Sequence, residues 1–253
     1  MPLTLNFQVV GSGEPVVILH GLFGSLTNWQ QVAKQLATQY QVYSVDLRNH
    51  GQSPHDHSMH YTDMVADLEL FLRSQSIADV HLIGHSMGGK VAMQYSLAHS
   101  EQVSSLTVVD IAPVQYHHDF NDIIAGLKAI DLEALTGRQQ AVDVLAPYVK
   151  PLGLRQFLLQ NLVSNNGQYQ WRINISAIEH EITNIGDFPD VDGAYLGPTL
   201  FVKGEDSDYV LPEYEAQINQ WFPHAQIEGI AEAGHWVHAE QPKLFMQALL
   251  SFL

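Results

Sequence analysis

The segment Val80–Met93 reads VHLIGHSMGGKVAM and decides the fold class. It starts with four residues, Val80–Ile83, that have the apolar character of a buried strand, and Lys90–Met93 have the character of a helix. Between them stands Gly84-His85-Ser86-Met87-Gly88, which matches the pattern G-x-S-x-G. Where a strand precedes it and a helix follows it, this pattern predicts a tight turn that lifts a serine above the end of a parallel sheet.

The rest of the chain repeats this alternation of short apolar runs and longer helical segments, which is typical of βαβ units. We predict buried strands at Val16–Leu19, Gln41–Val45, Val80–Ile83, Leu106–Val109 and Thr199–Val202, and an edge strand at Leu3–Val9. We predict helices at about Trp29–Thr38, Met64–Ser74, Gly89–Ala98, Pro212–Trp221 and Pro242–Phe252. The sequence therefore predicts an α/β fold with a mostly parallel sheet and helices on both faces.

Residues 114–188 interrupt this alternation. Helical segments such as Phe120–Ile130, Arg138–Val149 and Leu154–Leu162 follow one another there without a clear strand between them. We therefore expect residues 1–113 and 189–253 to form the α/β core, and residues 114–188 to form an inserted helical cap. An insertion at the carboxyl ends of the strands would lie over a functional site, whereas the alternative is a set of ordinary surface helices.

The composition excludes several classes of function. The chain has 253 residues, enough for one large domain or a core with a small cap, and its formal net charge of −16 opposes binding to nucleic acid or anionic membranes. It contains no cysteine, so disulfides, thiolate nucleophiles and cysteine metal sites are excluded. Residues 1–6 do not resemble the start of a signal peptide, and no apolar run approaches the roughly 20 residues of a membrane span. We expect a cytoplasmic protein.

Ser86 is the predicted nucleophile. Gly84 and Gly88 leave space for a sharp, strained reversal of the chain, and the helix that follows directs its first N–H groups at the site. A serine in an ordinary glycine-rich turn is the alternative. The strand before the motif and the helix after it favour the nucleophile.

A second glycine-containing loop, His20-Gly21-Leu22-Phe23-Gly24, directly follows the strand Val16–Leu19. Acyl transfer requires preorganised donors for the oxyanion, and a backbone N–H from such a loop joins the one that follows the nucleophile. We expect the backbone N–H groups of Leu22 and Met87 to form this oxyanion hole. Phe23 is the alternative to Leu22.

His235 is the predicted general base, because a serine hydroxyl needs an imidazole to accept its proton. It lies in Ala233-Gly234-His235-Trp236, late in the chain and before the last predicted helix. The chain has 14 histidines, and His238 is the main rival. The histidines of the motif loops, His20, His50 and His85, are expected to orient the backbone, and no histidine cluster indicates a metal site.

The acid that orients the imidazole should lie between Ser86 and His235, in the chain order serine, acid, histidine. Two regions qualify, since each follows a predicted strand. One is Asp110, and the other is the segment Gly204-Glu205-Asp206-Ser207-Asp208. For each region the alternative is a structural role, in which the acidic side chain only accepts hydrogen bonds from N–H groups of the loop.

The motifs together resemble the α/β-hydrolase superfamily and, more narrowly, the YbfF-like esterases. The resemblance spans essentially the whole chain, with the motifs in order: His20–Gly24, Asp46–Ser53, Gly84–Gly89, Asp110–Pro113 and Gly234–Trp236. It implies the α/β-hydrolase fold and a hydrolase activity. In the Asp46–Ser53 stretch we expect Asp46 and Arg48 to support the loop that bears the oxyanion donor.

The resemblance also bears on the acid. Many members of the superfamily carry the acid three positions after the glycine that ends the penultimate core strand, and here that position, counted from Gly204, is Ser207. The similar esterases use the aspartate at the end of the preceding core strand. This implies Asp110 as the acid, Ser207 as a supporting hydrogen-bond partner and Asp208 as the second choice.

We therefore expect a serine hydrolase that cleaves small carboxylic esters or acyl thioesters through an acyl-enzyme at Ser86, without metal or organic cofactor. Carboxylate nucleophiles, as in dehalogenases and epoxide hydrolases, do not fit Ser86. Other reactions on this fold keep the serine. The alternatives are a carbon–carbon bond hydrolase, a cofactor-free haloperoxidase, a lyase, and a non-catalytic ligand receptor.

Overall fold

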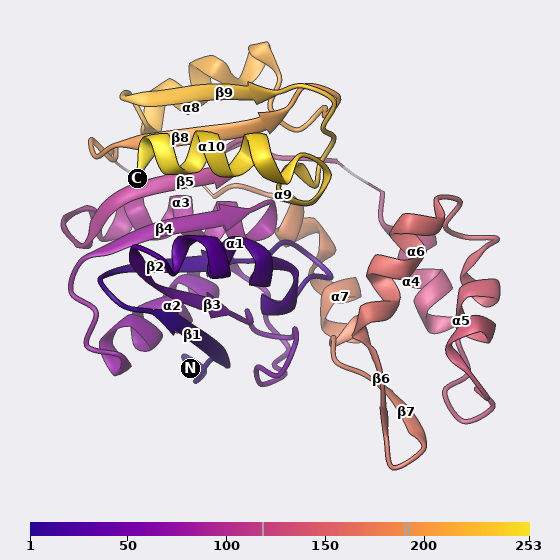
Figure 1. Cartoon of the computed structure of the whole chain (residues 1–253). Helices are drawn as coiled ribbons and strands as arrows, with labels where there is room; N and C mark the ends of the chain where they lie inside the picture. The colour runs from indigo at the N-terminus through magenta and orange to yellow at the C-terminus, as the bar shows by residue number, and fades with distance from the viewer. Residues whose placement is uncertain (118, 190, 192) are drawn as a thin grey trace.

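A seven-stranded sheet forms the centre of the computed structural model, which describes residues 1–117, 119–189, 191 and 193–253 (Figure 1). The strand order is β1-β3-β2-β4-β5-β8-β9; β1 is antiparallel to β3 and all other neighbours are parallel. The bounds are Phe7–Gly11 (β1), Glu14–Leu19 (β2), Tyr40–Val45 (β3), Val80–His85 (β4), Val103–Val109 (β5), Thr199–Gly204 (β8) and Ala225–Ile230 (β9). The predicted α/β fold class is confirmed.

Helices cover both faces of the sheet, because successive residues of each buried strand point to opposite faces. Val16 and Ile18 of β2 belong to the same buried cluster as residues of α1 and α10, whereas Val17 and Leu19 belong to the cluster that includes residues of α2, α3 and α8. Figure 1 shows α1 and α10 in front of the sheet and α2 and α3 behind it. The helices span Gln30–Leu36 (α1), Tyr61–Ser74 (α2), Met87–Ala98 (α3), Glu215–Trp221 (α8), Val237–Glu240 (α9) and Pro242–Phe252 (α10).

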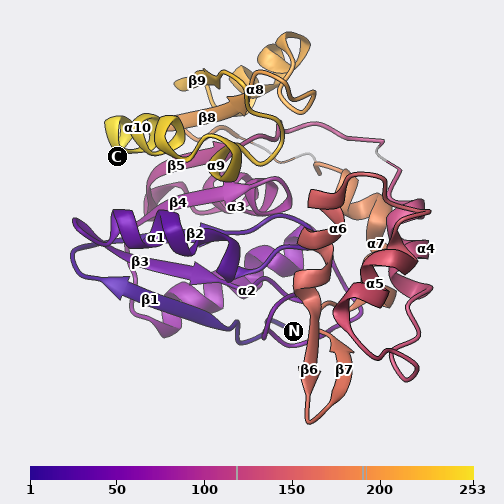
Figure 2. The same ribbon diagram turned by 45° about the vertical axis from the view of Figure 1, so that its right-hand side comes forward.

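The segment between β5 and β8 carries most of the remaining elements and lies beside the sheet (Figures 1 and 2). It holds α4 (Asn121–Lys128), α5 (Arg138–Leu145), α6 (Leu152–Leu158), β6 (Leu162–Asn165), β7 (Gln168–Trp171) and α7 (Ile175–Gly186). The antiparallel hairpin β6–β7 was not predicted. Its two-residue turn, Asn166-Gly167, has positive φ at both positions, as the preferred hairpin turns require.

The edge strands also differ from the prediction. β1 begins at Phe7 rather than Leu3, and β9 was missed altogether. Among the described strands β9 pairs with β8 alone, and most of its residues are exposed, so it lacks the apolar run that marks a buried strand. Among the described residues, no helix combines the length and apolar character needed to cross a membrane.

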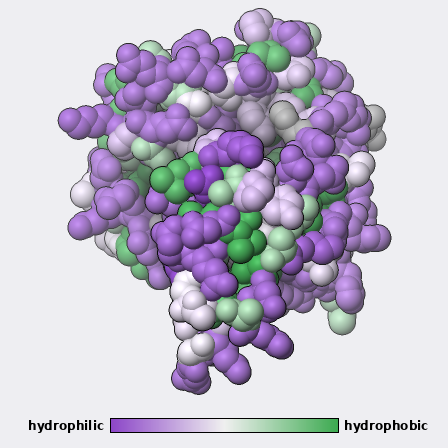
Figure 3. All heavy atoms as spheres, turned by 90° about the vertical axis from the view of Figure 1, so that its right-hand side faces the viewer, coloured by the Kyte–Doolittle hydropathy of each residue, from purple (hydrophilic) through white to green (hydrophobic). Residues whose placement is uncertain are grey.

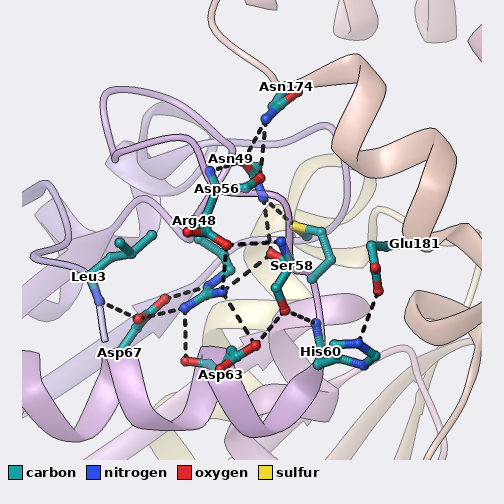
Figure 4. A network of polar contacts seen from close by, with 11 residues as sticks. Leu3, Arg48, Asn49, Asp56, Ser58, His60, Asp63, Asp67, Asn174 and Glu181 are labelled. Atoms are coloured by element: carbon teal, nitrogen blue, oxygen red, sulfur yellow. Dashed lines mark hydrogen bonds and ion pairs between the residues drawn. The ribbon is translucent and has the colours of Figure 1, made fainter. Parts of the chain in front are cut away.

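A buried ion pair joins the loop after β3 to α2 (Figure 4). Two nitrogens of the Arg48 guanidinium donate to the two carboxylate oxygens of Asp67, at 2.7 and 2.9 Å, and Leu3 N donates to the same carboxylate at 2.6 Å. The guanidinium also donates to the carbonyls of Ser58 and Asp63 at 3.3 Å. Because Arg48 and Asp67 are each 1% exposed, the charges depend on each other rather than on water.

We expect Asp67→Asn to lower the free energy of unfolding by about 3–5 kcal/mol, because it removes the buried charge that contacts the Arg48 guanidinium directly. The carboxylates that remain, Asp56 and Asp63, are more distant, at 3.8 and 3.7 Å, and partly exposed. Urea unfolding measures this loss. The control is Glu179→Gln, which breaks the half-exposed pair with Lys128 and should cost less than about 1 kcal/mol. Equal losses in the two variants would contradict the assignment of Arg48 and Asp67 as an energetically important buried pair.

Candidate active site

Ser86 lies on a strained turn between β4 and α3, with φ 51° and ψ −121°. Its N–H donates to the carbonyl of Val109 at 3.0 Å, which ties the turn to β5. Strand and helix approach so closely that a Cβ on Gly84 would lie 2.3 Å from the carbonyl oxygen of Gly88, and one on Gly88 would lie 2.5 Å from that of Leu19. The two glycines of the motif are therefore required by backbone contact.

His235, Asp110 and Ser207 come together at the ends of β5 and β8. Nδ1 of His235 lies 2.8 Å from Oδ2 of Asp110, and Ser207 Oγ lies 2.5 Å from the same oxygen. Gly204 N donates to the other carboxylate oxygen at 3.0 Å. Since the Asp110 carboxylate is fully buried and accepts from each of these groups, it holds Nδ1 of His235 as a donor and leaves Nε2 to accept a proton.

The other candidate acids lie in the segment that follows β8. Glu205, Asp206 and Asp208 are exposed, while Ser207 between them turns its hydroxyl to Asp110. The structure thus places Asp110, rather than Asp208, on the imidazole of His235.

Ser86 and His235 line one apolar cavity, which we call the His235 cavity; its lining also includes Leu22, Phe23, His85, Phe120, Ile123, Leu154, Phe157, Tyr209 and Trp236. The imidazole of His235 stacks on the ring of Tyr209, with centroids 3.9 Å apart. Within the described part of the chain, no hydrogen bond joins the two side chains of Ser86 and His235. Such contacts commonly tighten only when substrate binds.

A smaller cavity, which we call the Lys90 cavity, also reaches Ser86. Leu22, Met87 and Lys90 line it together with Ser86. Met87 is the first residue of α3, where helix N–H groups have no partner within the helix. Phe23 N, the alternative donor, is already engaged, since it donates to Nε2 of His50 at 3.2 Å. The geometry therefore favours Leu22 over Phe23 as the second donor.

Two buried histidines hold the loop that carries Leu22. His20 Nε2 accepts from Leu47 N at 3.0 Å, and His50 Nε2 accepts from Phe23 N. Burial lowers the pKa of both imidazoles, that of His50 to about 3, so both stay neutral and can accept these bonds. Asp46 adds a third tie, because its carboxylate accepts from Leu26 N at 2.8 Å.

His238, the rival base, lies in the packing between α1 and α10. Its ring stacks on Trp29 with centroids 4.1 Å apart, and burial lowers its pKa to about 3. His85 donates through Nε2 to the backbone carbonyl of His235 at 2.8 Å, and burial lowers its pKa as well. Among the described residues, no group of three histidines or carboxylates is arranged to hold a metal ion.

Comparisons with known proteins agree on one family. The family model described as alpha/beta hydrolase fold matches residues 14–242. The sn-1-specific diacylglycerol lipase ABHD11 of Danio rerio is 41% identical over 263 residues, covering 100% of this chain and 83% of the relative. Esterase YbfF of Escherichia coli K12 is 37% identical over 245 residues, covering 96% and 94%. A solved marine microorganism esterase is 45% identical, with a TM-score of 0.96, and covers 99% and 100%.

The buried neutral histidines predict a loss of stability in acid. The pKa of His20, His50, His85 and His238 is lowered by burial, so below pH 6.5 the unfolded chain binds protons that the folded chain does not. Stability should be fully present above pH 6.5 and fall as the pH drops toward 3, by up to about 1.4 kcal/mol per pH unit for each histidine. Urea unfolding at pH 8 and pH 5 measures the difference.

His238→Phe is the matched variant for this experiment, because it keeps an aromatic ring against Trp29 and removes one titrating group. Its loss of stability between pH 6.5 and 5 should be smaller than that of the wild type by about 1.4 kcal/mol per pH unit. Identical pH slopes for the two proteins would show that His238 is not held neutral by the fold.

Proposed function

The chain belongs to the α/β-hydrolase family and is a serine ester hydrolase, and we propose that it acts through the triad Ser86, Asp110 and His235. The observation that carries the proposal is the 2.8 Å contact between the buried Asp110 carboxylate and Nδ1 of His235. The imidazole so held lines the same cavity as Ser86, which lies on the strained turn of a G-x-S-x-G motif.

The proposed reaction has two steps. In the first, Nε2 of His235 accepts the proton of Ser86 Oγ, and Oγ attacks the carbonyl carbon of the ester. The backbone N–H groups of Leu22 and Met87 stabilise the oxyanion, the bond to the leaving group breaks, and His235 returns the proton to the departing alcohol or thiol. In the second step Nε2 of His235 accepts a proton from water, whose oxygen attacks the acyl carbon. The bond from that carbon to Ser86 Oγ breaks, His235 returns the proton to Oγ, and the carboxylic acid is released.

Asp110 has two tasks in this scheme. It fixes the tautomer of His235, because an ionised carboxylate accepts only from a protonated Nδ1, and it stabilises the imidazolium that forms in each step. Ser207 supports Asp110 by donating to the same oxygen that faces His235. We therefore assign Ser207 a positioning role.

The two cavities at Ser86 suggest how the substrate lies. The leaving group must receive its proton from His235, so we assign it to the His235 cavity and the acyl chain to the Lys90 cavity. Both linings are largely apolar, and Figure 3 shows hydrophobic side chains gathered on the face that carries α4 to α7. An acyl ester or acyl thioester with apolar groups on both sides of the carbonyl fits this arrangement.

We further propose that residues 114–188 act as a cap on this site. Phe120 and Ile123 of the first cap segment, and Leu154 and Phe157 of α6, line the cavity that contains His235. The core supplies the reacting groups, and the inserted segment supplies much of the apolar surface around them.

Ser86→Ala should lower kcat/KM for p-nitrophenyl butyrate and for a butyryl thioester by at least about 10³-fold, since no other group replaces the attacking oxygen. Wild-type enzyme treated with a small alkyl fluorophosphonate should gain one adduct on Ser86, which peptide mass spectrometry locates. Thermal unfolding of the variant is the control for folding. Turnover by Ser86→Ala at the wild-type rate would refute the proposed nucleophile.

Asp110→Asn should lower kcat/KM by about 10³–10⁴-fold, because the amide no longer holds His235 in the required tautomer. The exposed Asp208 provides the matched variant, and Asp208→Asn should retain most of the activity. Both variants are measured with the same ester across pH 6 to 9. A severe loss in Asp208→Asn alone would move the acid to Asp208.

A further inference from the structure

Lys90 is a buried cation on the helix of the nucleophile, and the mechanism above does not use it. Its side chain is among the largest that are fully buried. Its ammonium donates to the carbonyls of Val114 at 3.0 Å, Gly186 at 2.7 Å and Asp187 at 2.8 Å. Its three protons therefore all go to backbone carbonyls, which lie near the two ends of the inserted segment 114–188.

The position of the ammonium is explained by the end of α7. The last carbonyls of a helix have no partner within it, and this end carries partial negative charge. Lys90 satisfies the carbonyl of Gly186, and Tyr61 OH donates to that of Ile185 at 2.7 Å. The ring of Tyr116 adds a cation–π contact, with the Lys90 nitrogen 4.9 Å from its centroid. Lys90 and Tyr61 thus hold the carboxyl end of α7 against α3 and α2.

The same end of α7 forms one wall of the Lys90 cavity. Ile182, Ile185 and Gly186 line that cavity together with Ser86 and Lys90 itself. Lys90 lies one helical turn after Ser86, and its backbone N–H donates to the carbonyl of Ser86 at 3.1 Å. One residue therefore contacts both the turn that carries the nucleophile and the wall that faces it.

Burial of the Lys90 side chain disfavours its charged form. Burial lowers the pKa of Lys90 to about 7, against the opposing effect of the Asp187 carboxylate. The titratable side chains beside it are Asp187 after α7, Tyr61 on α2 and Tyr116 after β5. A buried amine that contacts the wall of the cavity and lies one helical turn from the reacting serine indicates a role in the site as well as in stability.

We propose that Lys90 is a positioning residue that fixes the end of α7 against the nucleophile helix and so sets the acyl-chain preference of the enzyme. The inference rests on the proposed function, since it takes the Lys90 cavity as the acyl site. Without the ammonium, the carboxyl end of α7 loses the donor that joins it to the nucleophile helix and keeps Tyr61 OH and Tyr116 N as donors. The wall formed by Ile182 and Ile185 is then no longer held at one distance from Ser86.

The test compares Lys90→Met with wild type on p-nitrophenyl acetate, butyrate and hexanoate. We expect the ratio of kcat/KM for hexanoate to that for acetate to change by at least about tenfold, because a pocket distinguishes chains by the fit of each methylene. Rates are normalised to the amount of Ser86 that a small fluorophosphonate titrates. Lys128→Met is the matched control, since Lys128 also contacts α7 through Glu179, at 2.8 Å, but at the surface. It should keep the wild-type ratio.

A uniform loss on all three esters, or an unchanged ratio in a folded Lys90→Met, would overturn the proposal. If Lys90→Met does not fold, Tyr61→Phe decides, because it removes the neighbouring donor to α7 and keeps the ring. In Tyr61→Phe the ratio of kcat/KM for hexanoate to that for acetate should change in the same direction but by a smaller factor. An unchanged ratio in this variant would also overturn the proposal. Failure of the proposed function would give a different result: the fluorophosphonate would not label Ser86 in the wild-type enzyme.

Discussion

The chain can turn from β4 into α3 only where backbone atoms meet without side chains between them. A Cβ on Gly84 would collide with a carbonyl oxygen of α3, and a Cβ on Gly88 would collide with one of β2. The strained backbone of Ser86 is therefore possible because these two residues of the motif have no side chain. This contact sets β2, β4 and α3 at a fixed spacing. Since β5 pairs with β4, and β8 with β5, the same sheet brings Asp110 and Ser207 to the end of the sheet where Ser86 lies.

Much of this arrangement could be predicted from the sequence, because its signals are local. Buried parallel strands are short apolar runs, and the motif around Ser86 fixes which strand precedes the serine. Asp110 was one of two candidates until the serine at position 207 and the resemblance to known esterases favoured it. In the structure Ser207 contacts the Asp110 carboxylate, whereas the role of each side chain in catalysis stays a proposal.

The features that were not predicted have no local signal or a weak one. The partners of Lys90 lie 24, 96 and 97 residues away along the chain, so nothing near the lysine marks it as different from a surface residue. The bond from Phe23 N to His50 likewise spans 27 residues. β9 is an exposed edge without an apolar run. The hairpin β6–β7 is the exception, since Asn166-Gly167 is a recognisable turn sequence.

The two ends of the inserted segment meet at Nζ of Lys90, which donates to the carbonyls of Val114 and Gly186. The ends also contact each other directly, since Tyr116 N donates to the carbonyl of Gly186 at 2.8 Å. The chain therefore leaves the core and re-enters it at neighbouring points, as it would for a surface loop. Residues between these points can be gained or lost without shifting the strands that carry the reacting groups, as long as contacts such as that of Asn161 with the carbonyl of Phe23 are kept. Evolution can thus exchange the insertion as a unit and obtain new substrate preferences on unchanged catalytic machinery, provided that the three carbonyls still reach the lysine.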